Sequence, residues 1–516
     1  MKSSYRHLSA NYKALKRAKT YQQWLGAAEE IDTLEGHSRW RGNDESGYYP
    51  YELLQEQIDL LTEYREEHRI GCLISYMQES LHRTLGELTD SHLYDTSLVG
   101  TKYLVEQYLD EVEETLNYLC DADLDIIDEA KKLKLFKHAR NNFGRSALML
   151  SGGGAFGIYH LGIIKALLEQ NLLPSVISGT SMGAIVTGLV GTHSDEELLE
   201  KLSVPEDNDF SPIKHRSFME IFSKKSLLES EQLLQCISNN IPNDTFLEAY
   251  LRTGRAINIT VSPTRAGQKA RVLNYKTAPN VLVAYACKAS CSIPGVFPAV
   301  QLRAKNAEGA VVPYMESELW ADGGVSTDIP MARIGRIFNA NHFIVSQTNP
   351  HVLPFVANRS KKGVLPFVID FASSSIHAQW HQVITVTKKH TQNRTLRFWL
   401  DRADALLGQD YLGDINLHPD FPIKKYLKVM TNPSDEEIYD FILTGERSTW
   451  PNIAMIRNQT RISRVLARCY EKCYAKHHGH THRSESIGKN SFVDIDGAVP
   501  GEDIELSINV QETSLA

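Results

Sequence analysis

The fold is decided by residues 147–185, which read ALMLSGGGAFGIYHLGIIKALLEQNLLPSVISGTSMGAI. Two short apolar runs, Ala147–Leu150 and Val176–Ile177, each lead into a glycine-rich turn, and a longer apolar segment separates them. Short runs of this kind suit buried strands, whereas the longer segment suits a helix. The stretch therefore predicts a strand–helix–strand unit that carries two glycine motifs.

The first motif is Gly152-x-Gly154-x-x-Gly157, which follows a strand and opens a helix as a dinucleotide-binding fingerprint would. That interpretation also needs a carboxylate near the end of the next strand, to bind a ribose hydroxyl. The next strand instead ends in Ile177-Ser178-Gly179-Thr180, and the first acidic residue after it is Asp195. The nucleotide hypothesis therefore lacks its carboxylate.

The second motif, Gly179-Thr180-Ser181-Met182-Gly183, suits a serine nucleophile. Glycines two residues before and two after Ser181 allow a tight turn without Cβ clashes. A helix beginning near Met182 would favour negative charge at its N-terminus. When a serine attacks an ester, the resulting oxyanion needs preorganised N–H donors, which Gly152, Gly153 and Gly154 can supply because no side chain blocks the approach.

A serine nucleophile also needs a base, and the best candidate is Asp322 in Trp320-Ala321-Asp322-Gly323-Gly324. An apolar strand delivers this aspartate, and the two glycines after it would let it sit beside another segment of backbone. Taken alone, Asp322 would better suit an ordinary Asp-Gly turn. Cys287 and Cys291, four residues apart, are expected to pack in the core beside the site.

Beyond this unit, the chain of 516 residues is too long for one typical domain. Short apolar runs alternate with helical segments from about residue 145 to 350, which predicts an α/β domain. The expected strands are Ala147–Leu150, Val176–Ile177, Ala256–Val261, Val272–Leu273, Leu319–Ala321 and His342–Ser346.

The flanking regions are expected to be helical. Residues 1–140 should form an N-terminal domain, because apolar residues recur at helical spacing within 51–61 and 103–119. Acidic residues beside the second segment are expected to form a solvated face; they are Glu106, Asp110, Glu111, Glu113 and Glu114. Residues 351–475 should form a helical C-terminal extension, and residues 476–516 a disordered tail.

Bulk properties exclude some functions. The net charge of −8 argues against a nucleic-acid binder that neutralises phosphates. Seven cysteines without dense spacing favour a reducing compartment, and residues 1–19 lack the apolar segment of a signal peptide, so a cytoplasmic protein is expected. Residues 147–164 and 172–190 lack charged side chains but contain turn-forming clusters, which favours a buried α/β core over membrane spans.

The glycine loop, the Gly-Thr-Ser-Met-Gly elbow and the Asp-Gly-Gly resemble the patatin-like phospholipase family. The fuller resemblance is to its triacylglycerol lipase branch, and it covers most of the chain. It includes residues 100–104 (GTKYL), 291–298 (CSIPGVFP), 338–347 (FNANHFIVSQ) and 411–415 (YLGDI). The resemblance implies a patatin-like α/β/α core and an enzyme that hydrolyses carboxylic esters.

The same resemblance implies a Ser-Asp dyad in place of a triad. Ser181 would attack, Asp322 would accept its proton, and Gly152, Gly153 and Gly154 would form the oxyanion hole. It implies no metal and no organic cofactor. Some members of the branch are credited with acyl transfer through a His-x4-Asp motif, but no histidine of this sequence has an aspartate five positions later.

The sequence leaves two other interpretations of the function open. A Ser-His-Asp α/β-hydrolase would follow the chain order Ser181, Asp322, then His342 or His351. A non-catalytic scaffold at a lipid surface would need neither Ser181 nor Asp322. A metal site built from Cys469, Cys473 and the histidines at 477, 478, 480 and 482 is disfavoured, because these histidines fall in the polar tail.

The expected partners are a lipid ester substrate and a membrane or lipid-droplet surface, and the oligomeric state is left open. Residues 364–369 (VLPFVI) follow Lys361 and Lys362, and residues 396–400 (LRFWL) follow Lys388 and Lys389. Basic residues beside aromatic and aliphatic ones suit a lipid interface, although ordinary core helices with basic flanks would read the same way.

Overall fold

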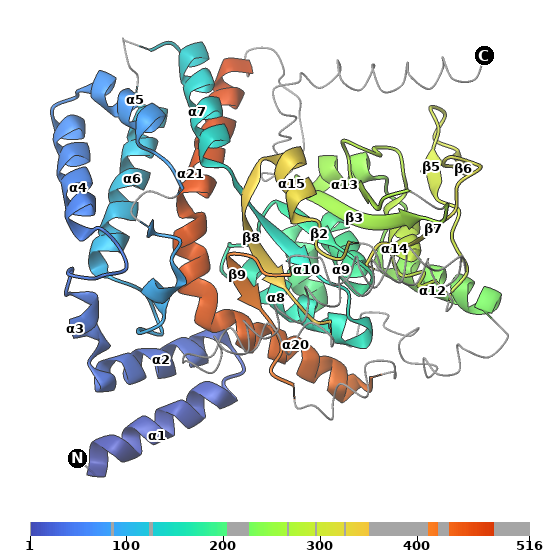
Figure 1. Ribbon diagram of the computed structural model, residues 1–516, viewed down its shortest axis with the longest axis horizontal. Helices are drawn as coiled ribbons and strands as arrows, with labels where there is room; N and C mark the ends of the chain where they lie inside the picture. Colours follow the sequence, from blue (N-terminus) through green and yellow to red (C-terminus); the bar gives the residue numbers. More distant parts are fainter. Residues whose placement is uncertain are drawn as a thin grey trace, which may run out of the picture.

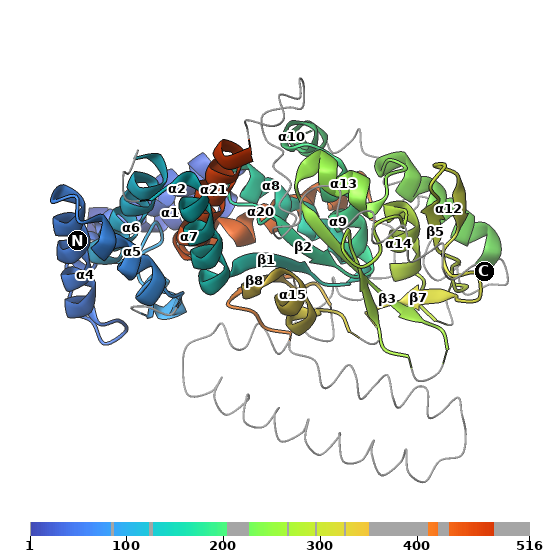
Figure 2. The ribbon, with the colours of Figure 1, turned by 90° about the horizontal axis from the view of Figure 1, so that it is seen from above.

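The computed structural model describes residues 2–83, 87–122, 127–203, 226–265, 268–294, 297–324, 327–349, 411–421 and 433–478. Figures 1 and 2 show a helical region beside a sheet that has helices on both faces. The helical region comprises α1 (Lys2–Arg17), α2 (Tyr21–Glu35), α3 (His37–Arg41), α4 (Tyr51–Glu66), α5 (Ile70–Glu79), the short 3-10 helix η2 (Ser91–Tyr94), α6 (Tyr103–Asp121) and α7 (Glu129–Phe143).

Sequence signals mark the ends of these helices. Helix α2 begins after Thr20, whose hydroxyl accepts a hydrogen bond from the Gln23 N–H at 3.3 Å. It ends at Gly36, whose φ of 76° is easily reached only without a side chain. Helix α7 begins in the same way after Asp128, whose carboxylate accepts from the Lys131 N–H at 2.7 Å.

The sheet domain contains strands and helices in alternation, as the sequence predicts. Its strands are β1 (Arg145–Leu150), β2 (Val176–Gly179), β3 (Ala256–Pro263), β4 (Arg271–Leu273), β5 (Arg303–Lys305), β6 (Val311–Pro313), β7 (Trp320–Asp322), β8 (Ala340–Ser346) and β9 (Ile415–Leu417). Its helices are η3 (Gly154–Ile158), α8 (Tyr159–Glu169), α9 (Met182–Thr192), α10 (Asp195–Ser203), α12 (Ser226–Asn240), α13 (Phe246–Thr253), α14 (Val283–Ser290) and α15 (Met331–Phe338). All six predicted strands are confirmed.

The main sheet has the strand order β4-β3-β2-β1-β8-β9. Strands β3, β2, β1, β8 and β9 run parallel, whereas β4 and β7 pair with β3 in the antiparallel direction. Strands β5 and β6 form a separate antiparallel pair. The carboxyl ends of β1, β2 and β8 lie together, because Leu150 is opposite both Gly179 and Ser346.

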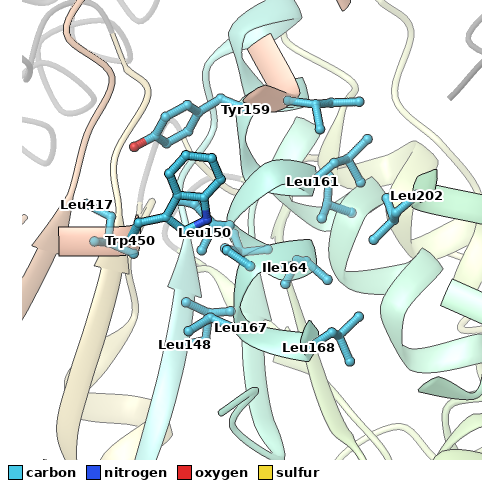
Figure 3. Packing of buried hydrophobic residues seen from close by; sticks show 14 of the residues in the cluster. Leu148, Leu150, Tyr159, Leu161, Ile164, Leu167, Leu168, Leu202, Leu417 and Trp450 are labelled. Atoms are coloured by element: carbon cyan, nitrogen blue, oxygen red, sulfur yellow. The ribbon is translucent and has the colours of Figure 1, made fainter. Parts of the chain in front are cut away.

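Both faces of the sheet are buried, as expected for parallel strands covered by helices. In β1, Leu148 and Leu150 belong to one apolar cluster, and Ala147 and Met149 belong to another. The first cluster includes residues of α8, and Figure 3 shows this packing. The second cluster includes residues of α13, α14 and α15. This alternation of side chains along β1 confirms the α/β class.

Helix α8 also packs on α20 (Asp435–Thr449), which the 3-10 helix η6 (Trp450–Asn452) joins to α21 (Ile453–His478). The two helices approach closely where glycines face each other. A Cβ atom at Gly162 would lie 1.8 Å from the Ile442 carbonyl oxygen, and one at Gly445 would lie 2.2 Å from the Tyr159 carbonyl oxygen. The backbone contact therefore depends on both glycines.

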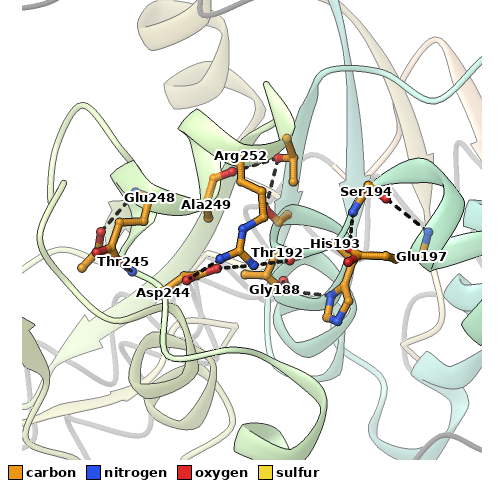
Figure 4. A network of polar contacts seen from close by, with 12 residues as sticks. Gly188, Thr192, His193, Ser194, Glu197, Asp244, Thr245, Glu248, Ala249 and Arg252 are labelled. Atoms are coloured by element: carbon orange, nitrogen blue, oxygen red, sulfur yellow. Dashed lines mark hydrogen bonds and ion pairs between the residues drawn. The ribbon is translucent and has the colours of Figure 1, made fainter. Parts of the chain in front are cut away.

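A polar network anchors the end of α9, the helix that begins beside Ser181 (Figure 4). Arg252 of α13 donates to the Asp244 carboxylate at 3.0 Å and to the Thr192 carbonyl at 3.1 Å. The start of α13 is fixed by a capping box between Thr245 and Glu248. Helix α9 is thus held at the end opposite Ser181.

Helix α21 returns to the helical region and completes its core. Buried residues of α21 from Ile462 to Cys473 share one apolar cluster with residues of α4, α5, α6 and α7. The acidic residues of α6, predicted to form a solvated face, instead make ion pairs. Arg65 of α4 pairs with Glu111 and Glu114, and α21 supplies Arg461 to Asp110 and Glu113. The prediction is thus right only in part: Asp110 and Glu114 are exposed, whereas Glu111 and Glu113 are half-buried because α4 and α21 pack beside this face.

The C-terminal extension also differs from its prediction as a purely helical segment. Strand β9 lies within it and pairs with β8, so the extension contributes to the main sheet. Helix α21 continues to His478, past the predicted start of the tail. The interfacial segments 364–369 and 396–400 lie outside the described residues.

The two apolar stretches without charges form buried elements of the sheet domain. Residues 147–164 contain most of β1, all of η3 and the first turns of α8, and residues 172–190 contain β2 and most of α9. Among the helices that the structure describes, none has both the length and the apolar character to cross a membrane.

Candidate active site

The predicted site residues gather at the carboxyl edge of the parallel strands. Ser181 follows β2, and the loop Gly152–Gly154 follows β1, the neighbouring strand in the sheet. A Cβ atom at Gly152 would lie 3.3 Å from the Cβ of Ser181. The glycine loop therefore lies directly against the predicted nucleophile, as the short sequence separation indicates.

Ser181 has an unusual backbone conformation, with φ of 53° and ψ of −122° just before the first turn of α9. A residue with a side chain rarely adopts a positive φ, so this turn is strained. The Ser181 N–H donates to the Ser290 hydroxyl at 2.9 Å, and that hydroxyl donates to the Thr260 carbonyl at 2.8 Å. These contacts with α14 and β3 hold the strained turn in place.

The glycines around Ser181 are required by close backbone packing. A Cβ atom at Gly179 would lie 2.1 Å from the Gly183 carbonyl oxygen, and one at Gly183 would lie 2.4 Å from the Leu150 carbonyl oxygen. Such distances exclude any side chain at either position. The Gly-x-Ser-x-Gly pattern therefore reflects the tight turn that presents Ser181.

The glycine loop is held by hydrogen bonds on both sides of Gly152. The Gly152 N–H donates to the Asp328 carboxylate at 2.9 Å. The Gly152 carbonyl accepts from the Ser151 and Thr348 hydroxyls, both at 2.8 Å. The predicted oxyanion hole used all three glycines, but the N–H of Gly152 already has a carboxylate acceptor. Gly153 is the N-cap of η3 and Gly154 is its first residue, and N–H groups at the start of a helix lack an intrahelical acceptor.

Asp322 is the last residue of β7 and is 3% exposed. One carboxylate oxygen accepts from the Gly324 N–H at 2.7 Å, and its own N–H donates to the Ser292 carbonyl at 2.9 Å. A Cβ atom at Gly324 would lie 3.1 Å from the Asp322 carboxylate and 3.1 Å from Cγ2 of Thr180, the residue before the nucleophile. The glycines after Asp322 thus allow it to lie beside the elbow.

Cys291 lies next to both predicted catalytic residues. Burial and the negative charge of Asp322 raise the pKa of the Cys291 thiol, whereas its hydrogen bond with the Ser181 side chain lowers it. Burial dominates, and the pKa lies well above its ordinary value, so the thiol is neutral. Cys287, its neighbour in sequence, is a core residue whose thiol faces the Ala184 carbonyl at 3.2 Å. The prediction of core packing thus applies to Cys287, whereas Cys291 lines the site.

Asp328 is a buried carboxylate that sequence reasoning missed. Besides the Gly152 N–H, it accepts a hydrogen bond from the Asn349 side-chain amide at 2.5 Å. Burial raises the pKa of Asp328 to about 7, although both hydrogen bonds lower it. The one signal in the sequence was its position, six residues after Asp322 in the same glycine-rich segment.

His160 is fully buried and contacts Ser151, the residue just before the glycine loop. Its Nε2–H donates to the Ser151 carbonyl at 3.0 Å, because a carbonyl can only accept, and its Nδ1 accepts from the Ser346 hydroxyl at 2.6 Å. Burial lowers the pKa of His160 to about 4, against the raising effect of the Ser151 carbonyl. The ring is therefore neutral and acts as a fixed support.

The histidines of the triad interpretation do not reach Ser181 in the described part of the chain. His342 lies in β8 opposite Ser146, at the far end of β1 from the glycine loop. Its two ring nitrogens contact the Ser146 hydroxyl at 3.0 Å and the Gln459 side-chain oxygen at 2.9 Å. His342 is thus a core histidine with both nitrogens satisfied, and His351 lies outside the described residues.

The cysteines near the C-terminus are part of the helical core. Cys469 and Cys473 of α21 are buried against Cys120 of α6, with Sγ of Cys120 and Cys473 3.9 Å apart. Over the described ranges, no group of three or more His, Cys, Asp or Glu side chains has the geometry of a metal site. His480 and His482 lie outside these ranges.

A strained serine elbow beside a glycine loop on a parallel sheet is an arrangement found among serine hydrolases. Two family models match the chain. Residues 4–141 match a domain of unknown function (DUF3336), and residues 148–333 match the patatin-like phospholipase family.

Sequence similarity to named relatives extends over most of the chain. Triacylglycerol lipase 4 of Saccharomyces cerevisiae is 33% identical over 463 residues, which cover 86% of this chain and 50% of that protein. Triacylglycerol lipase ptl3 of Schizosaccharomyces pombe is 32% identical over 467 residues, which cover 88% of this chain and 96% of that protein. The chain thus spans about half the length of the first relative and nearly all of the second.

This chain belongs to the patatin-like phospholipase family, and its relatives include proteins named triacylglycerol lipases. The resemblance inferred from the glycine loop, the elbow and the Asp-Gly-Gly is therefore confirmed. A crystal structure of VipD from Legionella pneumophila covers 58% of this chain and 67% of VipD, with 15% identity and a TM-score of 0.26. That similarity is too low to inform the site.

Proposed function

We propose that this protein hydrolyses fatty-acyl esters of lipids, with Ser181 as nucleophile and Asp322 as proton acceptor. The names of the relatives favour triacylglycerol as substrate, and the description of the family favours phospholipid. Both substrates contain the same carboxylic ester, so the reaction at Ser181 is common to them.

In the first half of the reaction, Oγ of Ser181 bonds to the ester carbonyl carbon while its proton passes to Asp322. The carbonyl oxygen becomes an oxyanion, to which the N–H groups of Gly153 and Gly154 donate. The bond to the alcohol then breaks, and the leaving oxygen takes the proton from Asp322. The fatty acyl group remains on Ser181.

The second half returns the enzyme to its starting state. A water molecule gives a proton to Asp322 and attacks the acyl carbon, and the same N–H groups hold the second oxyanion. The bond to Ser181 breaks, Oγ recovers a proton from Asp322, and the fatty acid leaves. Asp322 thus acts as base and acid in turn.

The observation that best supports this proposal is the conformation of Ser181. Strained backbone persists only where the surrounding structure enforces it, and it clusters at functional sites. Here the strain turns the one serine of the elbow toward the glycine loop, within contact of Gly152. A scaffold without catalysis would gain nothing from maintaining it.

We also propose that the protein works at the surface of a membrane or lipid droplet, as a peripheral cytoplasmic enzyme. Long-chain lipid esters reside in such surfaces rather than in water, so the active site must reach one. Flotation of purified full-length protein with triacylglycerol droplets or phospholipid vesicles measures this contact. Protein that never floats with either would contradict it.

The direct test is a substrate panel with matched variants. Purified protein is assayed on tri-, di- and monoacylglycerol, phospholipid and lysophospholipid, as wild type, Ser181→Ala and Asp322→Asn. Both substitutions should remove at least about 99% of the activity, since they delete the nucleophile or the base. Ser178→Ala is the matched control, because Ser178 is also buried in this segment and its hydroxyl has no hydrogen-bond partner within the described residues.

The outcomes separate the competing functions. Equal inactivity of wild type and Ser181→Ala on every ester would favour the non-catalytic scaffold. Substantial hydrolysis by folded Asp322→Asn would show that another base serves Ser181, and His351→Ala would then identify a triad. The pattern across the panel assigns the lipid class.

A further inference from the structure

The geometry points to Asp328 as a positioning residue that locks the glycine loop onto the serine elbow and so fixes the oxyanion hole. This inference rests on the proposed ester hydrolysis. It concerns the orientation of two peptide groups, and Asp328 itself touches no reacting atom in the proposed mechanism.

Asp328 reaches the glycine loop through its side chain. It is 3% exposed, and one carboxylate oxygen accepts from the Gly152 N–H at 2.9 Å. The other accepts from the Asn349 side-chain amide, so both oxygens are engaged. A buried carboxylate that accepts such bonds holds its donors firmly, because hydrogen bonds are stronger away from bulk solvent.

Asp328 reaches the elbow through its main chain. Its carbonyl accepts a hydrogen bond from the hydroxyl of Thr180 at 2.6 Å. Thr180 immediately precedes Ser181 and is fully buried. One residue therefore ties together the two motifs that the reaction needs at a fixed distance. No other residue in the described part of the chain is seen to bond both Gly152 and Thr180.

The two bonds of Asp328, to the Gly152 N–H and from the Thr180 hydroxyl, are called the clamp. The clamp restricts the orientation of the proposed oxyanion donors. The Gly152 N–H and carbonyl are held by different partners, so the residue cannot turn without breaking a buried hydrogen bond. In a trans peptide the carbonyl of one residue and the N–H of the next point in opposite directions. Holding Gly152 therefore sets the direction of the Gly153 N–H, which is a proposed donor to the oxyanion.

The clamp also lies close to the position that a side chain at residue 152 would take. A Cβ atom there would lie 3.3 Å from Cβ of Ser181 and 3.5 Å from both the Asp328 carboxylate and the Asn349 side-chain oxygen. The contact with Ser181 would be tight, whereas the other two distances are ordinary van der Waals separations. Removing the Asp328 side chain would leave the Gly152 N–H without its acceptor and so free the loop.

The test compares kcat and KM for a soluble short-chain ester between wild type, Asp328→Ala and Asp328→Asn. The alanine variant should lose about 100-fold in kcat, the size of effect seen when one oxyanion donor is lost, with KM within about threefold of wild type. The asparagine variant keeps an oxygen that can accept from Gly152, so it should recover most of that loss. Thr180→Val cuts the link to the elbow and should lower kcat in the same way.

Asp32→Ala is the matched control for a buried carboxylate with a purely structural role. Asp32 is 4% exposed and accepts from the Ser97 hydroxyl at 2.7 Å in the helical region. Its loss should lower the unfolding temperature and leave kcat unchanged. Should Asp328→Ala fail to fold, Thr180→Val carries the comparison, and a kcat within threefold of wild type in that folded variant overturns the inference.

The result is separable from the proposed function. If wild type hydrolyses the ester and Ser181→Ala does not, the reaction stands, and unchanged kcat in folded Asp328→Ala overturns only the positioning role. If wild type and Ser181→Ala are equally inactive, the proposed function itself fails, and the role of Asp328 fails with it.

Discussion

The hydroxyl of Thr348 donates to the carbonyl of Gly152 at 2.8 Å, from the segment that follows β8. The Thr348 N–H in turn donates to the Ser151 hydroxyl at 2.8 Å. The glycine loop after β1 is therefore fastened to the neighbouring strand of the sheet. Since this bond fixes the Gly152 carbonyl, it also bears on the Gly153 N–H, which points the opposite way.

We predict that Thr348→Val lowers kcat for ester hydrolysis by about 10-fold or more, because valine keeps the shape of threonine but cannot donate to Gly152. Thr348→Ser keeps the hydroxyl and should stay within about threefold of wild type. Steady-state kinetics on a soluble ester measure both. Equal activity of the valine and serine variants would show that the hydroxyl does not matter to the loop.

The contributions of Asp328 and His160 to the free energy of unfolding should depend on pH in opposite directions. Burial raises the pKa of Asp328 to about 7, above the value of about 3.9 in an unfolded chain, so its contribution falls as pH rises from about 4 to 7. Burial lowers the pKa of His160 to about 4, below about 6.5 when unfolded, so its contribution is lost as pH falls from 6.5 to 4. The two effects largely cancel in the wild type.

Asp328→Asn should therefore make the free energy of unfolding rise more steeply with pH between 4 and 7 than it does in wild type. The difference is on the order of a few kcal/mol, at about 1.4 kcal/mol for each pKa unit. Tyr411 and Asp322 are titratable residues near Asp328, and both are present in the wild type and in the variant. Denaturant unfolding at several pH values measures the two slopes, and parallel curves would contradict the raised pKa of Asp328.

The sequence predicts most of the fold because apolar runs mark buried strands. Strands β1, β2, β3, β4, β7 and β8 all lie at predicted positions. Strands β5, β6 and β9 were not predicted, because β5 contains two basic residues, β6 pairs only with β5, and β9 belongs to the sheet only because β8 pairs with it. The half-buried part of the acidic face of α6 was not predicted for a similar reason, since the arginines of α21 that pair with it are about 350 residues away in sequence.

The candidate site also contains residues that a local sequence pattern marks and residues that only distant contacts bring together. Ser181 and the glycines around it are visible in the sequence because the tight turn excludes side chains, and that leaves a local pattern. Asp328, Thr348 and His160 act through contacts between distant segments, so no local pattern marks them. Cys291 was seen but placed in the core, because its contact with Ser181 depends on how α14 packs on the sheet.

The ion pairs between α6 and α21 should contribute to stability. Glu113 accepts from Arg461 and, at 2.9 Å, from Arg468. Burial raises the pKa of Glu113, but the hydrogen bonds from these two arginines outweigh it, and the pKa is lowered overall. Glu113→Gln should lower the free energy of unfolding by on the order of 1 kcal/mol at pH 7, since the pairs are partly exposed. Denaturant titration measures the change.

This loss should shrink as pH falls below about 4.5, because a depressed carboxyl pKa stabilises the fold only where the carboxylate is charged. Glu66→Gln, at the exposed end of α4, is the control and should change stability by less than about 0.5 kcal/mol. A Glu113→Gln effect that is the same at pH 4 and pH 7 would mean that packing, and not charge, dominates.

The close approach of α8 and α20 predicts that a single added methyl group at Gly162 lowers stability. A Cβ atom at Gly162 would lie 1.8 Å from the Ile442 carbonyl oxygen and 2.8 Å from the Glu446 backbone nitrogen. Both are backbone atoms of α20, so relief requires the helices to move apart. Gly162→Ala should therefore lower the free energy of unfolding by about 1–3 kcal/mol or more.

Gly26→Ala is the matched control, because Gly26 also lies within a helix but a Cβ atom there would meet nothing within 4 Å. Alanine favours a helix over glycine by about 1 kcal/mol, so this variant should unfold at a higher temperature than wild type. Thermal unfolding of the two variants should thus shift in opposite directions. Stabilisation by Gly162→Ala would show that α8 and α20 do not pack as closely as this contact requires.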